Sequence, residues 1–169
     1  MSDDGNWTAL SSVTNNANAE IPRSYDSGGA NAYGGYYNWY AATAESGTYA
    51  MTSRNAEDSL CPAGWQLPIN GDSTTEKSWQ GLLFGSYGLS SNTASSRTMR
   101  QNPLSITLTG QYYWINGTLN NRGSYGVFWS SVAHSDNIYA HYLYFTNTAI
   151  NSPYANSKAY GLTVRCVQK

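Results

Sequence analysis

The sequence predicts a small α+β domain in which an early helix precedes several antiparallel strands. The chain has 169 residues, which suits one domain and is long enough to bury roughly 68–70% of its unfolded surface. A helix-capping pattern and an apolar stripe lie near residue 80, whereas an Asn-Gly turn and alternating apolar residues characterise the chain after residue 105. A helix followed by a series of strands is typical of the α+β class.

The first third of the chain is rich in turn-forming residues. We expect residues 1–34 to form a loop-rich N-terminal segment ahead of one globular unit, residues 35–169. The aromatic and alanine-rich run at 35–43 predicts a strand or a short buried helical turn. The next compact run, CPAGWQLP at 61–68, has two prolines that fix φ and a glycine that permits a turn. Within it Trp65 and Leu67 alternate, so we expect both side chains on the buried side.

The clearest helix signal begins at Ser73. Ser73 and Glu76 match the capping box, in which a serine hydroxyl and a glutamate carboxylate satisfy free amide donors at the helix start. An apolar face follows at i, i+3 and i+4, formed by Trp79, Leu82 and Leu83. Gly85 is the expected C-terminal stop. The polar run at 90–103 is predicted to be a loop.

Strand signals occupy the rest of the chain. Ile106 and Leu108 alternate with threonines, and Asn116-Gly117 is a strong hairpin signal because this pair tolerates positive φ. A further turn is expected at 120–123. Three more strands are predicted, at 124–131, 139–145 and 161–167. Residues 150–161 are consistent either with a long loop or with part of a binding surface.

Charge and apolar content exclude several classes of protein. Charged residues make up 11% of the chain, far below the usual ~25%, and 15 Tyr with 6 Trp argue against disorder. The net charge is −1 and the 9 Lys and Arg are scattered, so we expect no nucleic-acid partner. No stretch approaches the ~20 apolar residues of a membrane-spanning helix, so direct membrane insertion is not expected.

The composition also bears on location. The acidic, polar start is not a signal peptide, so either the protein is cytosolic or Met1 begins a trimmed form of a longer protein. Low charge and abundant Ser, Thr, Asn and Tyr favour the second interpretation. We therefore expect an extracellular, cell-surface or virion module.

No catalytic or metal-binding pattern stands out. His134, Ser135 and Asp136 contain the residue types of a catalytic triad, but three loop neighbours do not easily form its relay of hydrogen bonds. The other histidine, His141, has no His or Cys near it in the sequence, and the 10 carboxylates are dispersed. We expect no enzymatic activity, no metal and no other cofactor.

The chain contains two cysteines, Cys61 and Cys166. They could pair and close a loop of 105 residues, or remain free thiols in a reducing compartment. The sequence alone leaves both possibilities open.

Several motifs together resemble the Fibrobacter succinogenes major paralogous domain over residues 35–167. They are YYNWYAA at 36–42, CPAGWQLP at 61–68, FWSS at 128–131, AHYLYF at 140–145 and GLTVRCV at 161–167. That family is similar to C-type-lectin-like domains, which have a small antiparallel β core, one or two helices and many loops. The resemblance implies an extracytoplasmic location and a bridge between Cys61 and Cys166.

Two groups of proteins with that fold have functional residues that this sequence lacks or would use for a disulfide. Sugar-binding C-type lectins hold calcium with a Glu-Pro-Asn or Gln-Pro-Asp loop and a Trp-Asn-Asp strand, and this sequence has neither. Formylglycine-generating enzymes share the broad fold but use reactive cysteines, which a Cys61–Cys166 bridge would occupy. We therefore expect neither calcium-dependent sugar binding nor that enzymatic activity.

The C-terminal part also resembles the variable proteins of diversity-generating retroelements. In those proteins, adenine-specific mutagenesis converts Asn codons near the C-terminus into codons for Tyr, His, Asp, Ser and others, and the stretch from His134 to Tyr160 has this composition. Between Val132 and Gly161 there are five Tyr, one Lys, one Asp and no Glu. Rigid tyrosines mixed with adaptable Asn and Ser are typical of antibody paratopes.

Eleven residues of this stretch are therefore candidate ligand contacts: His134, Asp136, Asn137, Tyr139, His141, Tyr142, Tyr144, Asn151, Tyr154, Asn156 and Ser157. Strand alternation predicts that Leu143 and Phe145 face the core, and that Tyr142 and Tyr144 point outward as the most exposed anchors.

These observations predict a non-catalytic ligand-binding module on a cell or virus surface, whose diversified tail contacts protein or carbohydrate on another cell surface. An undiversified bacterial surface or adhesion domain is the first alternative. A formylglycine-generating type of enzyme is the second. The sequence leaves the oligomeric state open.

Overall fold

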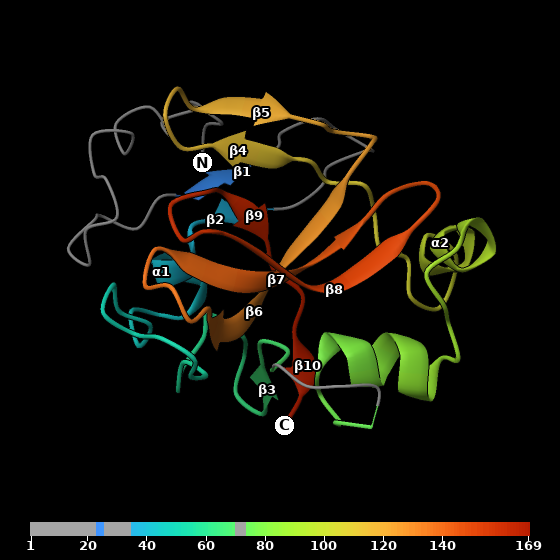
Figure 1. The fold of residues 1–169 in the computed structure, drawn as a ribbon, viewed down its shortest axis with the longest axis horizontal. Helices are drawn as coiled ribbons and strands as arrows, with labels where there is room; N and C mark the ends of the chain where they lie inside the picture. The colour runs from blue at the N-terminus through green and yellow to red at the C-terminus, as the bar shows by residue number, and fades with distance from the viewer. Residues whose placement is uncertain (1–22, 26–34, 70–73) are drawn as a thin grey trace.

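A computed structural model describes residues 23–25, 35–69 and 74–169. Most of the expected N-terminal segment, 1–34, lies outside the described residues, as does Ser73 of the predicted capping box. A six-stranded sheet crosses the molecule, and short helices and two small two-stranded sheets surround it (Figure 1). The chain is thus a mixed α+β domain made mostly of strands, which confirms the predicted class.

The sheet has the strand order β1-β2-β9-β6-β7-β8. Its strands are β1 (Arg23–Tyr25), β2 (Gly35–Tyr37), β9 (Leu162–Thr163), β6 (Gly126–Ala133), β7 (Tyr139–Phe145) and β8 (Ile150–Ser157). All neighbouring strands run antiparallel except β6 and β9, which are parallel with Phe128 opposite Thr163. The three longest strands, β6, β7 and β8, lie side by side, and β8 forms an edge.

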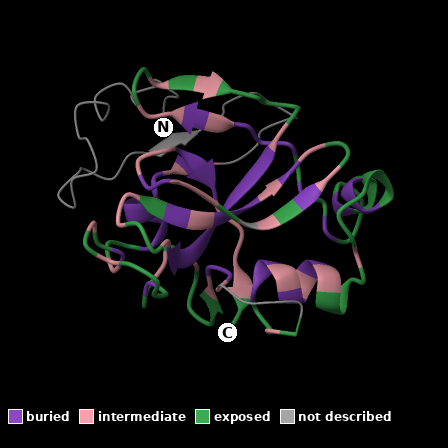
Figure 2. Cartoon of the chain, in the orientation of Figure 1, coloured by how far each residue is buried: buried purple, intermediate pink, exposed green. Residues whose placement is uncertain are grey.

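The sheet buries side chains on both of its faces. On one face lies the α1 core, which includes Trp39, Tyr40, Leu67, Val127, Trp129 and Leu162. On the other lies the η3 core, which includes Trp79, Leu83, Met99, Phe128, Leu143 and Phe145. Every residue of β6 is buried as a result, whereas β8 has intermediate and exposed residues (Figure 2). Such a doubly covered strand carries apolar residues in succession and does not alternate.

The run at 35–43 contains both of the structures that its sequence allowed. Strand β2 is followed directly by α1 (Trp39–Ala42), a single buried helical turn. The helix begins after Asn38, whose side-chain oxygen accepts a hydrogen bond of 2.8 Å from the N–H of Ala41. All four helical residues are buried, because the turn lies against the α1 core.

The predicted early helix is present but begins later than expected. Trp79 and Gln80 lead into η3 (Gly81–Ser86), and Ser78 caps it by accepting the N–H of Gly81 at 2.8 Å. A Cβ on Gly81 would meet the carbonyl oxygen of Thr75, so this close approach requires glycine. Trp79 and Leu83 are buried as predicted.

A second helix lies where a loop was predicted. Residues 93–99 form α2 (Thr93–Met99), which begins at Asn92 through a 2.9 Å hydrogen bond from the N–H of Ser95. The polar sequence concealed it, but Met99 is fully buried in the η3 core. This contact stabilises a helix too short to form alone.

The Asn116-Gly117 hairpin is confirmed. It joins β4 (Gln111–Tyr113) to β5 (Thr118–Asn120), and Gly117 has a φ of 66°. The expected strand around Ile106 and Leu108 is not formed, although both side chains are buried. There the alternation reflects packing into the η3 core without a partner strand.

The chain end is tied to its middle by a disulfide between Cys61 and Cys166, with Cα atoms 5.8 Å apart. Beside it, β3 (Trp65–Gln66) pairs with β10 (Val167–Gln168). The expectation for Trp65 is wrong, because its side chain is 45% exposed whereas Leu67 is buried. Strand β3 ends at Gln66, so side-chain alternation does not continue from Trp65 to Leu67.

Candidate functional site

The predicted ligand contacts lie on β7, on β8 and on the connection that precedes β7. Alternation divides them between the two faces of the sheet. Tyr142 and Tyr154 are opposite each other in the ladder and share one face with Tyr144. His141 lies on the other face, where the centroid of its ring is 5.2 Å from the ring centroid of His134.

Four rings on the first face form a continuous group, here called the tyrosine face: Tyr125, Tyr142, Tyr144 and Tyr154. The ring centroids of Tyr125 and Tyr144 are 5.1 Å apart, and Tyr144 stacks on Tyr154 at 5.4 Å. Tyr142 meets Tyr154 edge to face at 5.7 Å. Such aromatic pairs contribute about 0.5–1.5 kcal/mol each beyond their buried area. The rings therefore hold one another in position.

Tyr125 was not among the predicted contacts. It directly precedes β6, and alternation along that strand puts it on the same face as Val127 and Trp129. The sequence carries this signal, but Tyr125 lies ahead of the Tyr-rich stretch between Val132 and Gly161 that indicates the other contacts.

Exposure increases across the tyrosine face. Tyr142 is only 5% exposed, Tyr144 is intermediate and Tyr154 is 53% exposed. The expectation that Tyr142 is an exposed anchor is therefore wrong. The physical reason is that the α1 core covers this face of the sheet at Tyr142, which packs 6.1 Å from the ring of Trp129. Tyr142 thus supports the rings that reach solvent.

An irregularity in β8 sets the position of Tyr154. Tyr142 pairs with Tyr154, but Tyr144 pairs with Asn151, so β8 has one more residue than β7 in this interval. A bulge of this kind bends a strand and re-aims its side chains. Here Tyr154 contacts both Tyr142 and Tyr144.

On the other face of the sheet, His134 and His141 lie next to each other. The His134 Nδ1 accepts the N–H of Asp136 at 3.1 Å, and the Asp136 carboxylate accepts the N–H of Ile138 at 2.9 Å. The carboxylate therefore bonds to the backbone and not to the imidazole ring. The Nδ1 of His141 is buried without a hydrogen-bond partner among the described residues. Burial, and then the neighbouring His134, lower the pKa of His141.

The remaining candidates differ in how freely they could contact a ligand. Asp136, Tyr139 and Asn151 are exposed, and Asn137 is intermediate. Asn156 uses its side chain internally, since its Nδ2 donates to Gln111 and its Oδ1 accepts from the N–H of Ser157. The expectation for Ser157 is wrong, because it is buried at the end of β8. The next residue, Lys158, accepts the N–H of Trp39 in the α1 core with its carbonyl oxygen at 2.9 Å.

Lys158, the single lysine between Val132 and Gly161, points inward. It is fully buried, and its ammonium donates to the carbonyl oxygens of Thr48 at 3.0 Å and Met51 at 2.9 Å. The Nζ also lies 4.8 Å from the ring centroid of Trp39. Burial lowers the pKa of Lys158 to about 8. The lysine thus anchors the end of β8 and adds no charge to the surface.

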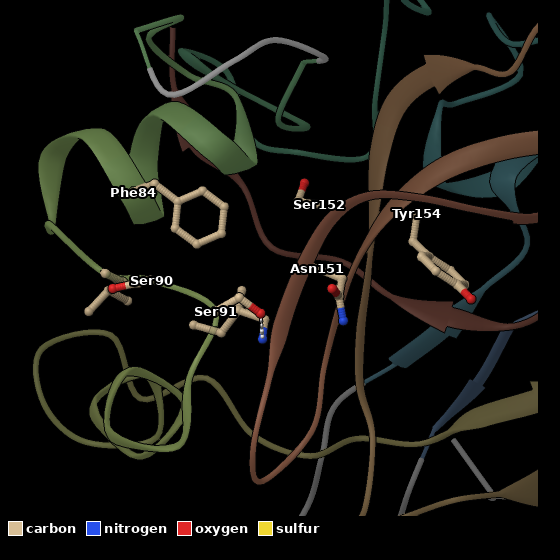
Figure 3. A pocket seen from close by; sticks show the side chains of 8 residues that line it. Phe84, Ser90, Ser91, Asn151, Ser152 and Tyr154 are labelled. Carbon is tan, nitrogen blue, oxygen red and sulfur yellow. Dashed lines mark hydrogen bonds between the residues drawn. The ribbon is translucent and has the colours of Figure 1, made fainter.

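A groove of about 460 Å³ adjoins the tyrosine face (Figure 3). Phe84, Leu89, Ser90 and Ser91 line it on one side, and Ile150, Asn151, Ser152 and Tyr154 of β8 line it on the other. None of these residues is charged. Tyr154 belongs both to the groove and to the tyrosine face.

The described part of the chain holds no group of three or more His, Cys, Asp or Glu that could bind a metal ion. It also has no free cysteine. No helix among the described residues is long and apolar enough to span a membrane.

The partly buried position of Tyr144 predicts a pH effect. Burial and hydrogen bonding with Tyr125 raise the pKa of Tyr144 to about 12, above the ordinary value of 10.0. Because the folded chain favours the neutral phenol, this contribution to stability is complete below pH 10 and is lost as the pH rises toward 12. An ultraviolet titration of phenolate absorbance should show that Tyr144→Phe removes a tyrosine that ionises late. A difference curve with its midpoint near pH 10 would contradict this prediction.

No family model, curated protein or solved structure matches this chain. The C-type-lectin-like fold therefore stays a prediction from the sequence motifs. The function has to be inferred from the geometry of the described residues.

Proposed function

We propose that this chain is a non-catalytic binding module whose tyrosine face contacts the surface of another protein. The observation that carries the proposal is the series of contacting rings Tyr125, Tyr144 and Tyr154, which runs from half-buried positions to solvent. Protein interfaces are enriched in tyrosine and depleted of Lys and Glu. Strands β7 and β8, which carry Tyr144 and Tyr154, contain no Asp, Glu, Lys or Arg, and the lysine that follows β8 is buried.

Ring packing favours binding because it reduces the entropy lost on association. A tyrosine has two side-chain torsions, and binding usually costs about 0.5–1.5 kcal/mol for each flexible side chain that becomes ordered. Tyr144 is already held between Tyr125 and Tyr154 in the free chain. Much of that ordering therefore precedes contact with the ligand.

The same strands separate framework from display positions, which supports diversification of the retroelement type. Leu143, Phe145 and Ile150 are almost completely buried in the η3 core. Exposed Tyr139, Asn151 and Tyr154 lie between or beside them. Changes at the exposed positions would leave the core unaltered, as a variable binding protein on a cell or virus surface requires.

Two features favour binding over catalysis. Both cysteines form the disulfide, so neither supplies the thiolate that a formylglycine-generating type of enzyme needs. His134 and Asp136 do not form a carboxylate–imidazole pair, since the carboxylate accepts from the backbone.

The binding proposal is tested with a phage-displayed library of the full chain. Tyr125, Tyr144 and Tyr154 are randomised together and selected against purified lysozyme and serum albumin. A control library randomises the exposed Glu57, Arg97 and Arg100. We expect folded, saturable binders from the first library and none from the second, since only the first varies the proposed contact surface. Equal yields from both libraries would contradict a dedicated tyrosine face.

Diversification is tested separately on the encoding DNA. We expect a near-copy of the segment that encodes residues 134–160, with adenines at the codons of its Tyr, His and Asp residues, beside a reverse transcriptase. Absence of the copy from the locus would refute diversification. The chain would then be an undiversified binding domain.

A further inference from the structure

The groove beside Tyr154 has an apolar floor. Phe84 lies in η3 (Figure 3). Leu89 follows that helix, and Ile150 begins β8. All three pack against the η3 core, so the floor is held by the interior of the domain. Phe84 and Leu89 are only partly buried and still present apolar surface to the groove.

The rim of the groove carries neutral hydrogen-bonding groups. The side chains of Ser90, Asn151 and Ser152 have no hydrogen-bond partner among the described residues. The amide of Asn151 offers both a donor and an acceptor, and each serine hydroxyl offers the same. These groups match peptide N–H and C=O groups, and no formal charge is present to select a charged ligand.

The edge of the sheet is closed at this point. Gln80 donates its side-chain N–H to the carbonyl oxygen of Ser152, and the Ser91 hydroxyl accepts the N–H of Ile150 at 3.2 Å. A ligand strand therefore cannot extend the sheet through these two backbone groups. The groove must bind its occupant by side-chain contacts.

Tyr154 makes the groove continuous with the tyrosine face. Its ring stacks on Tyr144, and the residue also lines the groove together with Asn151 and Ser152. A protein seated on the tyrosine face would therefore also cover the groove. Interfaces concentrate their binding energy where an anchor side chain fills a pocket of this kind beside aromatic residues.

We propose that the groove is an anchor pocket that takes one uncharged, apolar side chain of a protein ligand, with Asn151 and Ser152 bonded to the flanking peptide groups. The volume of about 460 Å³ lies within the usual range of roughly 300–1,000 Å³ for ligand pockets and accommodates a residue of leucine or phenylalanine size with its adjoining amides. This inference rests on the proposed function, because it names the part of the ligand that the module recognises.

In the test, capped amino acids are titrated into the isotope-labelled full chain, and binding is measured from NMR chemical-shift changes. N-acetyl-phenylalanine amide and N-acetyl-leucine amide should shift the signals of Leu89, Asn151 and Ser152 saturably. Half-saturation is expected on the order of 1 mM for ligands this small. N-acetyl-glycine amide has the same peptide groups without a side chain and should bind about tenfold more weakly, since it buries no apolar side chain. The acidic N-acetyl-aspartate amide should not bind saturably.

Two matched variants locate the binding. Ser90→Trp fills the groove and should abolish the shifts, whereas Thr107→Trp places the same ring at another exposed position and should leave them unchanged. Saturable binding of methyl glucoside in place of the two apolar probes would overturn the inference, because the groove would then select a sugar. Absence of saturable shifts with both apolar probes would overturn it as well.

These outcomes are distinguishable from failure of the proposed function. The capped amino acids report on the groove without a protein ligand, and the phage library reports on binding by the tyrosine face. Probes that fail while the library succeeds refute the anchor pocket alone. If the probes bind but the library yields no binders, the groove selects apolar side chains but the protein-binding function is refuted. The role of the groove in binding a protein ligand is then refuted as well.

Discussion

Replacing Cys166 with serine is expected to lower the free energy of unfolding by about 4 kcal/mol. A crosslink that closes a loop of ~100 residues contributes roughly 4.7 kcal/mol in the chain-entropy description. The Cys61–Cys166 bridge spans 105 residues and lies beside the short pairing of β3 with β10. Those two strands have two residues each and provide little pairing of their own. The effect is measured by denaturant unfolding at neutral pH, as a lower midpoint.

The double variant Cys61→Ser, Cys166→Ser is the matched control. It also lacks the bridge but carries no unpaired thiol, so it should lose the same amount as the single variant. Reductant should lower the stability of the parent chain to that level and leave the double variant unchanged. A double variant as stable as the parent chain would show that the bridge contributes nothing to the fold.

Replacing Trp129 with alanine is expected to destabilise the chain by about 3–5 kcal/mol, the range for a buried Trp or Phe cut to Ala. Trp129 is fully buried in the centre of β6, and its indole N–H donates to the carbonyl oxygen of Tyr37 at 2.8 Å. Its ring also supports Tyr142, which in turn contacts Tyr154. The variant therefore loses a large apolar volume and the base of the tyrosine face together.

Two further variants distinguish residues that stabilise the core from residues that are available to a ligand. Trp129→Phe keeps most of the ring volume and should cost less than Trp129→Ala. Tyr154→Ala removes a ring that is 53% exposed and leaves no buried cavity, so it should cost less than Trp129→Ala; its two ring contacts are worth about 0.5–1.5 kcal/mol each. Denaturant unfolding of all three variants gives the comparison. Similar losses for Tyr154→Ala and Trp129→Ala would mean that Tyr154 is structural, which would undermine its role as a display residue.

Local signals determined much of the secondary structure from the sequence. The Asn116-Gly117 turn and the strand at 139–145 are where the sequence predicts them, because turn chemistry and side-chain alternation depend on neighbouring residues. Leu143 and Phe145 are buried as predicted for the same reason. The early helix follows Ser78, the next serine after Ser73, because the Ser78 hydroxyl accepts the N–H of Gly81.

Contacts between distant segments decided what those signals could not. Strand β8 and helix α2 have polar sequences that resemble loops. Pairing with β7 orders β8, and burial of Met99 orders α2. The pairing of Cys61 with Cys166 likewise depends on the approach of two segments 105 residues apart.

The candidate site shows the same division. Composition alone identified the tail as rich in Tyr, Asn and Ser, and this prediction needed no structure. The tertiary structure decided which tyrosines reach solvent, because a second core covers the face that alternation assigned to Tyr142. It also brought the ring of Tyr125 against Tyr144, and it formed the groove between Phe84 and Asn151, which lie far apart in the chain. Alternation specifies the face of a strand that a side chain occupies, but exposure depends on what else packs against that face.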